Sequence, residues 1–371
     1  MTVLPLAAII WRFSIKKMAS ILMVATACAS VGVIMMLVQE GLRLKTVSKL
    51  TASVDQANSS FCTPQQLAKG TWVKNITDRA PYSVAQQFGN LLVSKCYNVT
   101  DVFSVTPWIS YEWVPNDDCV FRAWDPDLFC SRFANQTISF LGDSLSWEMF
   151  CALGYSLGTA YLDEHLIGRP AIASKTDVII DVCHNTTRLT FRRDDYLQQI
   201  PTILQEQNPN ILVLNRGAHY VDDVRLEQGI RENIAQLEAH QRNLTFRNDK
   251  FQVVLRLTVP GHPLCKQFQE PSSSLEDMWS LINNKSLYTK DFHPKAPTFR
   301  WWEFQKQNSL ILDLYRREIS NVSYQVLDAV IPLVLRPDLH SDCLHSCLPG
   351  RIDLYHRMFL HQLTSTSTAA S

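Results

Sequence analysis

Two short segments, far apart in the chain, carry the residue types of an acyl-transfer triad. Gly142-Asp143-Ser144 follows an apolar run, and Asp342 precedes His345 by three positions. A serine at the N-terminus of a helix could act as a nucleophile, because free N–H groups and the helix dipole stabilise negative charge there. Asp342 could fix the tautomer of His345, which would accept the serine proton as a general base. The chemistry that this set predicts is acyl transfer through Ser144.

Both segments also have simpler interpretations. In the first, Asp143 or Ser144 could merely cap the helix, a position that both residue types favour. The second could be an ordinary polar loop, or it could bind zinc, since it contains the ligand types His340, Asp342, Cys343, His345 and Cys347. In an oxidising compartment, such cysteines form disulfides more readily than metal sites. We therefore expect no metal.

A third segment begins at Asn215, directly after another apolar run. An amide N–H at this position could point at an oxyanion formed beside a neighbouring strand. Alternatively, Asn215 and Gly217 simply form the turn that the chain needs where the strand ends.

The elements that must position these segments alternate between strands and helices. Apolar strand-like runs occur at 138–141, 178–182, 211–214, 251–259 and 324–331, and helix-length stretches occur at 145–157, 194–206, 224–240, 301–319 and 352–363. This alternation predicts an α/β fold, with a parallel sheet covered by helices on both faces. Residues that follow the strands would then gather at the carboxyl edge of the sheet.

Composition limits the class of protein. The chain has 371 residues, with 35 Lys and Arg against 35 Asp and Glu, so its formal net charge is zero. That balance gives no global attraction to nucleic acid, and we expect no nucleic-acid partner. Hydrophobic residues make up 46% and charged residues 19%, which excludes a mainly disordered chain.

The N-terminal region predicts entry into the secretory pathway. No charged residue occurs from 18 to 38, a run long enough to span about 30 Å of hydrocarbon as a helix. A cleaved signal peptide with its site near Ala25-Thr26-Ala27 is the alternative, although the apolar run continues beyond that point. Flanking charges leave the orientation nearly undecided. Sequons place the rest of the chain in the lumen, and all of their acceptors follow the run: Asn58, Asn75, Asn98, Asn135, Asn185, Asn243, Asn284 and Asn321.

Cysteine usage agrees with an oxidising lumen. Of the 10 cysteines, all but Cys28 follow the apolar run, which suggests up to four disulfides and one free thiol. We expect a type II membrane protein with a short cytoplasmic tail (1–17), a transmembrane signal anchor (18–38), a stem (39–60), a cysteine-rich irregular subdomain (61–130), a catalytic domain (131–363) and a tail (364–371).

The three segments together, in this order, resemble the SGNH (GDSL-type) hydrolase superfamily, which has a flavodoxin-like sheet. More narrowly, the chain resembles the PC-esterase and trichome-birefringence-like family of polysaccharide O-acetyltransferases, over roughly Phe61 to Leu360. The most specific match is Asp-Cys-X-His-X-Cys-Leu-Pro-Gly, from Asp342 to Gly350. The other matches are Cys62, Gly70-Thr71-Trp72, Trp113-Val114-Pro115, Cys119 and the strand Val254-Leu255-Arg256 that precedes Cys265.

The resemblance implies a role for each matched residue. Ser144 would be the nucleophile, His345 the general base and Asp342 the residue that orients it. The family's Asn-Thr-Gly-His-Trp element matches the segment from Asn215, which implies an oxyanion contributor there. The residues expected at the oxyanion or the substrate are Gly142, Asp143, Asn215, Gly217 and Arg192.

The chain departs from the family pattern at several positions. Arg216 replaces a threonine, Ala218 displaces His219 by one position, and Ser346 stands where the family has tryptophan. No glycine follows the second strand near 183–185, so Arg192 or Arg193 could replace the oxyanion donor that is usual there.

The function that the resemblance implies is O-acetyl transfer to a glycan or cell-wall polysaccharide in the Golgi lumen. An acetyl donor is required as co-substrate, and neither a metal nor another cofactor is expected. The same triad would serve a glycan acetyl esterase if water reached the acyl-enzyme. A catalytically inactive, glycan-binding luminal protein is the third possibility. The sequence leaves the oligomeric state open.

Overall fold

The computed structural model describes residues 60–75, 110–158, 177–220, 222–245, 251–289, 292–293, 295–340 and 342–365. The predicted anchor (18–38), the cytoplasmic tail and nearly all of the stem lie outside these residues. None of the helices in the described ranges has the length and apolar character of a membrane span. Residues Phe61–Ser371 form one compact unit, which includes both the predicted cysteine-rich segment and the predicted catalytic domain.

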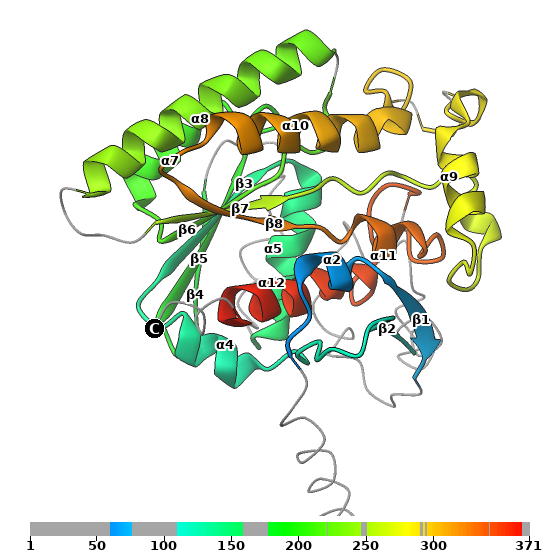
Figure 1. The fold of residues 1–371 in the computed structure, drawn as a ribbon, viewed down its shortest axis with the longest axis horizontal. Coiled ribbons are helices and arrows are strands. Elements are labelled where there is room, and N and C mark those ends of the chain that lie inside the picture. The colour runs from blue at the N-terminus through cyan, green and yellow to red at the C-terminus, as the bar shows by residue number, and fades with distance from the viewer. Residues whose placement is uncertain are drawn as a thin grey trace, which may run out of the picture. The chain divides into compact units, whose positions relative to one another are not determined.

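A six-stranded sheet forms the centre of this unit (Figure 1). Its strands lie in the order β4-β5-β3-β6-β7-β8, where β4 is Val178–Val182, β5 Thr187–Arg193, β3 Thr137–Gly142, β6 Ile211–Leu214, β7 Gln252–Arg256 and β8 Ser323–Leu327. All neighbouring pairs are parallel except β4 and β5. The predicted α/β fold with a mostly parallel sheet is therefore confirmed. Numbered in chain order, the five parallel strands lie 2-1-3-4-5 across the sheet.

The β4–β5 hairpin is the main departure from the expected arrangement. The sequence predicted a parallel strand at 178–182 and a helix at 194–206. Instead, β4 is an antiparallel edge strand, β5 follows it, and the helix α7 begins only at Ile200 and ends at Gln207. Cys183, His184 and Asn185 all have positive φ, which turns the chain back tightly after β4. Arginines at both ends of β5 obscured its apolar pattern.

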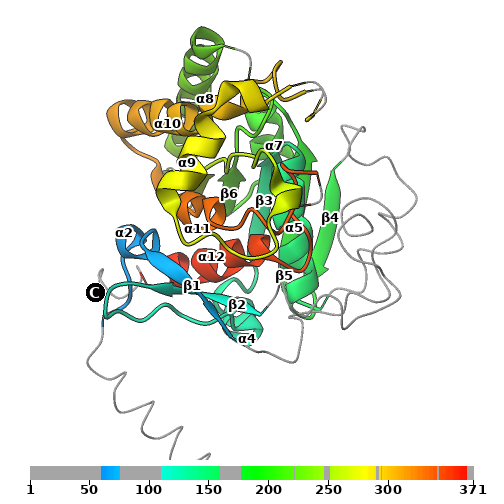
Figure 2. The same cartoon turned by 90° about the vertical axis from the view of Figure 1, so that its right-hand side faces the viewer.

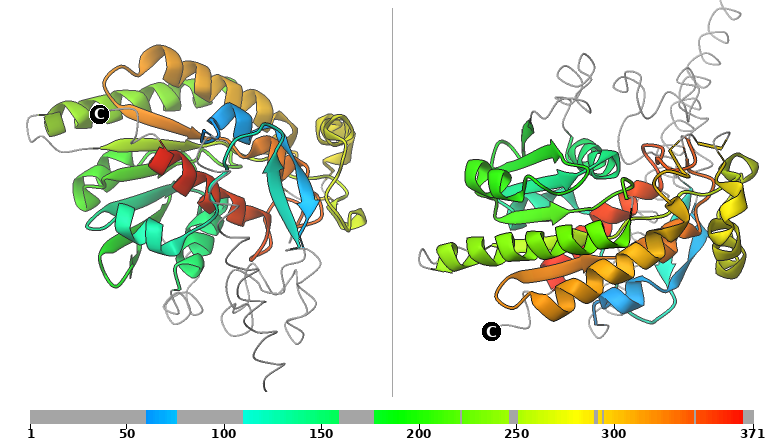
Figure 3. Two further views of the ribbon diagram at one scale, coloured as in Figure 1. Left: turned by 60° about the horizontal axis from the view of Figure 1, so that its bottom comes forward. Right: turned by 90° about the horizontal axis from the view of Figure 1, so that it is seen from above.

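Helices cover both faces of the sheet, as expected (Figures 1 and 3). On one face, α7, α8 (Asp223–Thr245) and α10 (Phe304–Glu318) share a core with β6 and β7, and Figure 3 shows α8 and α10 side by side. On the other face, α4 (Pro126–Arg132), α5 (Ser144–Ser156) and α12 (Leu354–Ser365) pack against β3 and β5. Large aromatic side chains such as Phe140 and Phe150 fill that second core.

Two short helices were not expected from the sequence pattern. The run at 324–331 is a strand only as far as Leu327, because Asp328 accepts a hydrogen bond from the backbone N–H of Val330 and begins the helix α11 (Val330–Val334). The helix α9 (Leu275–Asn283) was not predicted, and it begins where the side chain of Ser274 caps its first turn.

The described part of the cysteine-rich segment is more regular than expected. After α2 (Pro64–Leu67), the strand β1 (Gly70–Lys74) pairs antiparallel with β2 (Tyr111–Pro115). Figure 2 shows this pair beside α11 and α12. The Trp72 indole N–H donates to the carbonyl of Pro332, 2.7 Å away, and buried Trp113 fills the space beneath the pair. This segment is thereby fixed to the C-terminal part of the chain.

Disulfides reinforce the unit, as the cysteine count predicted. The described pairs are Cys62–Cys119, Cys130–Cys183 and Cys265–Cys343. Cys347 is also disulfide-bonded, and Cys151 is a buried free thiol.

Candidate active site

Ser144 lies where β3 ends and α5 begins. Asp143 is the N-cap of this helix, and its Oδ1 accepts a hydrogen bond of 2.9 Å from the backbone N–H of Leu145. Ser144 is the first helical residue, and its side chain stays partly exposed. A Cβ on Gly142 would lie 2.2 Å from the Ser146 hydroxyl, so only glycine permits this close packing of the turn. Capping and a nucleophile position therefore coexist in one tripeptide.

The structure brings Ser144, His345 and Asp342 together. The Ser144 Oγ lies 2.8 Å from Nε2 of His345, and the other ring nitrogen, Nδ1, lies 2.8 Å from Oδ2 of Asp342. Asp342 also accepts the backbone N–H of His345 at 2.8 Å. With Nδ1–H donating to the carboxylate, Nε2 is free to accept the serine proton. The geometry is that of a nucleophile, a base and an orienting carboxylate.

The charges around His345 favour its protonated form. Burial alone lowers the pKa of His345, but the Asp342 hydrogen bond and the negative charges of Glu148, Asp342 and Asp143 outweigh it and raise the pKa to about 9. Burial likewise acts to raise the pKa of Asp342, yet its hydrogen bonds and the His345 charge hold that pKa well below its ordinary value. Asp342 is therefore ionised at neutral pH, and the imidazolium is well stabilised.

The loop that carries Asp342 and His345 is held from several sides. Cys343 adopts a positive φ of 64° and is tied by its disulfide to Cys265. Its carbonyl accepts the backbone N–H of His262 at 2.8 Å. Since Cys343 and Cys347 are both disulfide-bonded, neither thiolate is available as a zinc ligand.

Arg351 supports the same loop from inside the protein. Its guanidinium is buried, and it donates to the Ser346 hydroxyl at 3.0 Å and to the Leu344 carbonyl at 3.2 Å. One side chain thus binds both neighbours of His345, Leu344 through its backbone carbonyl and Ser346 through its hydroxyl. Sequence reasoning missed Arg351, which stands directly after the Leu-Pro-Gly of the matched motif and gave no catalytic signal.

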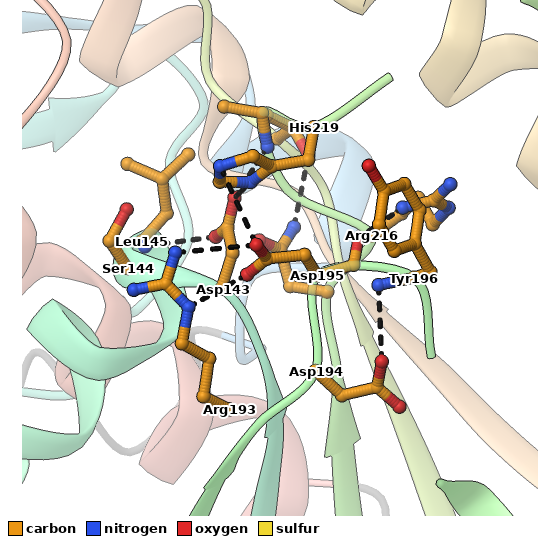
Figure 4. A network of polar contacts seen from close by, with 12 residues as sticks. Asp143, Ser144, Leu145, Arg193, Asp194, Asp195, Tyr196, Arg216 and His219 are labelled. Carbon is orange, nitrogen blue, oxygen red and sulfur yellow. Dashed lines mark hydrogen bonds and ion pairs between the residues drawn. The ribbon is translucent and has the colours of Figure 1, made fainter. Parts of the chain in front are cut away.

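Asp143 is the centre of a second polar network (Figure 4). Its buried carboxylate accepts the backbone N–H of Ala218 at 2.6 Å and lies 3.0 Å from Nδ1 of His219. Burial acts to raise the pKa of Asp143, but His219 and these backbone donors lower it overall. Gly217 has a φ of 72°, and a Cβ there would lie 2.1 Å from Oδ2 of Asp143. Gly217 is therefore required by the position of this carboxylate.

Asn215 lies at the carboxyl end of β6, as expected, but its side chain is fully engaged in the fold. Its amide donates both hydrogens, to the Arg256 carbonyl at 2.8 Å and to the Thr258 hydroxyl at 3.0 Å, and its oxygen accepts from the Arg256 guanidinium. The amide ties the ends of β6 and β7 together, and in this arrangement it has no N–H left for an oxyanion.

Arg192 points away from Ser144, contrary to the expected contact with oxyanion or substrate. It is buried and forms ion pairs with Asp177 and Glu206. Alternation along the strand explains the difference, because successive side chains of β5 face opposite sides of the sheet. The adjacent Arg193, which is in register with Gly142, lies beside Ser144 in Figure 4 and donates to Asp195 at 2.9 Å.

Arg216 acts on the loop that follows β5. Its guanidinium stacks on the ring of Tyr196 at 4.9 Å and donates to the carbonyl of Asp195. Asp195 Oδ2 in turn lies 3.7 Å from Nε2 of His219. Arg216 therefore holds the loop after β5 against the segment that follows β6.

An apolar wall stands next to the triad. Leu145 and Leu344, the neighbours of Ser144 and His345, pack with Trp301, Phe304 and other residues of the segment that precedes α10. The Trp301 indole N–H donates to the carbonyl of Ala218, which joins this wall to the Asp143 network. The sequence suggested a helix from 301 and offered Trp301 and Trp302 as residues that could stack on sugars, but their position beside Leu145 and Leu344 depends on contacts that are distant in sequence.

No protein-family model and no curated protein matches the chain.

Proposed function

We propose that the chain is a serine-dependent O-acetyltransferase that acts on hydroxyl groups of glycans or cell-wall polysaccharides. The observation that supports this most strongly is the hydrogen-bonded series Ser144–His345–Asp342, with a partly exposed serine at a helix N-terminus. The strand order 2-1-3-4-5 is that of flavodoxin-like sheets and supports an SGNH-type arrangement. Ligands of such sheets bind at the carboxyl ends of the strands, where Ser144 lies.

The proposed reaction has two half-steps. Ser144 Oγ attacks the acetyl carbonyl while its proton passes to Nε2 of His345, and the tetrahedral intermediate collapses as the leaving group takes that proton. In the second half, His345 accepts the proton of an acceptor hydroxyl, whose oxygen attacks the acetyl-serine. Collapse breaks the ester bond to Ser144, whose Oγ recovers the proton. Free N–H groups at the start of α5 are the donors closest to the oxyanion in this scheme.

Six of the predicted glycosylation acceptors lie in the described residues, and all six are exposed: Asn75, Asn135, Asn185, Asn243, Asn284 and Asn321. Exposure is what oligosaccharide attachment requires, and the disulfides suit an oxidising compartment. These two observations support the proposal of a luminal, Golgi-resident protein held by the segment 18–38.

The test uses a serine-reactive fluorophosphonate probe and an acetyl-transfer assay on the full chain, with Ser144→Ala as the decisive variant. We expect labelling and transfer in the wild type and neither in Ser144→Ala. Ser156→Ala, at the other end of the same helix, is the matched control and should retain both. Labelling that persists in Ser144→Ala would rule out the proposed nucleophile, and an unlabelled wild type would favour a glycan-binding protein.

Transferase and esterase are separated by supplying acceptor. The purified protein is incubated with an acetyl donor, with and without an unacetylated oligosaccharide. Acetylated oligosaccharide as the main product supports the transferase. Release of free acetate at the same rate in both samples supports the esterase alternative.

A further inference from the structure

A buried glutamate lies one helical turn beyond the proposed nucleophile. Glu148 follows Ser144 by four positions on α5, which puts both residues on the same side of the helix. Its side chain is 0% exposed. One oxygen, Oε1, accepts the backbone N–H of Ser346 at 2.9 Å, and Ser346 directly follows His345. The other oxygen, Oε2, has no hydrogen-bond partner among the described residues.

An ionisable group in this position needs a reason, since burying a carboxylate is costly unless its charge is compensated. The charged groups around Glu148 are His345, Arg351 and Arg256. They come from the loop that carries Asp342, from the short 3-10 turn before α12 and from the end of β7. One carboxylate oxygen, Oε1, already anchors the loop that carries His345, through its hydrogen bond with the Ser346 N–H. The other oxygen, Oε2, has no hydrogen bond within the part of the chain that the structure describes, and the carboxylate interacts with the charge of His345, the base that becomes positively charged in the proposed reaction.

We propose that Glu148 is a positioning residue for His345: it fixes the backbone after the histidine and supplies a second carboxylate charge that stabilises the imidazolium. This inference rests on the proposed function of the Ser144–His345 pair. Asp342 orients the ring through a direct hydrogen bond, whereas Glu148 acts through the Ser346 N–H and through its charge.

The ionisation of Glu148 makes the arrangement sensitive to pH. Burial, opposed by the charge of His345, raises the pKa of Glu148 to about 7. The groups that face His345 are Asp342 on its own loop, Asp143 and Glu148 from the beginning of α5, and His340, which burial keeps neutral by lowering its pKa. Of these, Glu148 is the group that gains its charge close to neutral pH.

The test compares Glu148→Gln with Glu148→Asp and the wild type. Glutamine retains an oxygen for the Ser346 N–H and removes the charge, while aspartate retains the charge. We expect Glu148→Gln to move the midpoint of the acid limb of kcat/KM down by about one pH unit. Its kcat at alkaline pH should fall about threefold to tenfold, because the base is weaker, with little change in KM. Glu148→Asp should restore the midpoint at least in part.

A matched control is Cys151→Ala, which changes a buried residue on the same helix without altering charge at neutral pH. This variant should keep the wild-type midpoint. If Glu148→Gln also keeps the wild-type midpoint, or if it loses activity equally at every pH, the electrostatic role of Glu148 is refuted.

Nuclear magnetic resonance separates this inference from the proposed function. The His345 ring proton of the wild type should report two ionisations, its own and that of Glu148, and only its own in Glu148→Gln. A single ionisation in the wild type would overturn the inference even if the variants fail to fold. Two ionisations in a chain that neither binds the fluorophosphonate nor transfers acetyl would support the coupling and reject only the proposed catalysis.

Discussion

Replacing Asp342 by asparagine tests most directly the proposal that His345 is a catalytic base. Asp342 accepts hydrogen bonds from three donors, the backbone N–H groups of Leu344 and His345 and Nδ1 of His345. An asparagine can keep its oxygen on the backbone donors, but its amide nitrogen then donates to Nδ1. The proton of the ring moves to Nε2, which faces Ser144 Oγ at 2.8 Å. Nε2 can then no longer accept the serine proton.

The expected loss follows from this change of tautomer. Removing the orienting carboxylate of a Ser-His-Asp set costs about 10⁴-fold in kcat, which is about 5.5 kcal/mol of barrier. The free energy of unfolding should change by less than about 2 kcal/mol, because the backbone hydrogen bonds of the turn can persist. A large kinetic effect with a small effect on stability is the signature of this mechanism.

The pH profile provides a second observable for the same variant. His345 acts as a base only when neutral, and its pKa is raised to about 9, so the wild-type rate should increase with pH up to about 9. The Asp342 hydrogen bond is a main cause of the raised His345 pKa. The residual activity of Asp342→Asn should therefore level off at a lower pH than that of the wild type.

The assay is the second-order rate of fluorophosphonate labelling of Ser144, measured between pH 5 and pH 10 on the full chain, together with urea unfolding. Asp353→Asn is the matched control, since Asp353 also accepts a backbone N–H in a turn, that of Gly350 at 2.8 Å. A labelling rate in Asp342→Asn above one tenth of the wild-type rate at every pH would refute the reasoning.

Three further predictions concern the frame around the site. Gly217→Ala should lower the free energy of unfolding by about 2–4 kcal/mol and reduce labelling. The new Cβ would displace the buried Asp143 carboxylate, and alanine is strained at the positive φ of this position. A variant as stable as the wild type in urea would contradict this. Replacing both Cys265 and Cys343 by serine should slow labelling of Ser144, since their disulfide fixes the loop that carries Asp342 and His345. Unchanged labelling kinetics would show that the loop is held without the disulfide. His356 is buried and its pKa falls to about 3, so the unfolded chain binds one more proton than the folded chain below about pH 6.5, and stability is lost as the pH falls toward 3. His356→Gln should reduce the pH dependence of the unfolding free energy by about 1.4 kcal/mol per unit in that range, and an identical slope in both proteins would disprove it.

Much of this architecture could be predicted from short stretches of sequence. The strand-to-helix change around Gly142 was visible because an apolar run gives way to residues that cap helices, and both signals lie within a few positions. The Asp342–His345 pair was equally readable, since its spacing fits one turn. Such features depend on short-range backbone geometry, which a few neighbouring residues determine.

Other features depended on what the fold brings alongside. β5 was missed because its arginines are neutralised by partners from elsewhere: Asp181 across the hairpin for Arg188, and Asp177 and Glu206 for Arg192. Asn215 looked like an oxyanion donor, and only the position of β7 shows that its amide is used to join two strand ends.

The sequence by itself determined the alternation of strands and helices, the disulfide chemistry and the residue types of the candidate triad, because each of these is set by local periodicity or by side-chain chemistry. The tertiary structure alone decided that Ser144 and His345 lie within hydrogen-bonding distance, that Arg193 rather than Arg192 lies near the serine, and that a buried glutamate lies behind the base. Each of these is a relation between residues that are distant in the chain, and it exists only once the strands have paired in register.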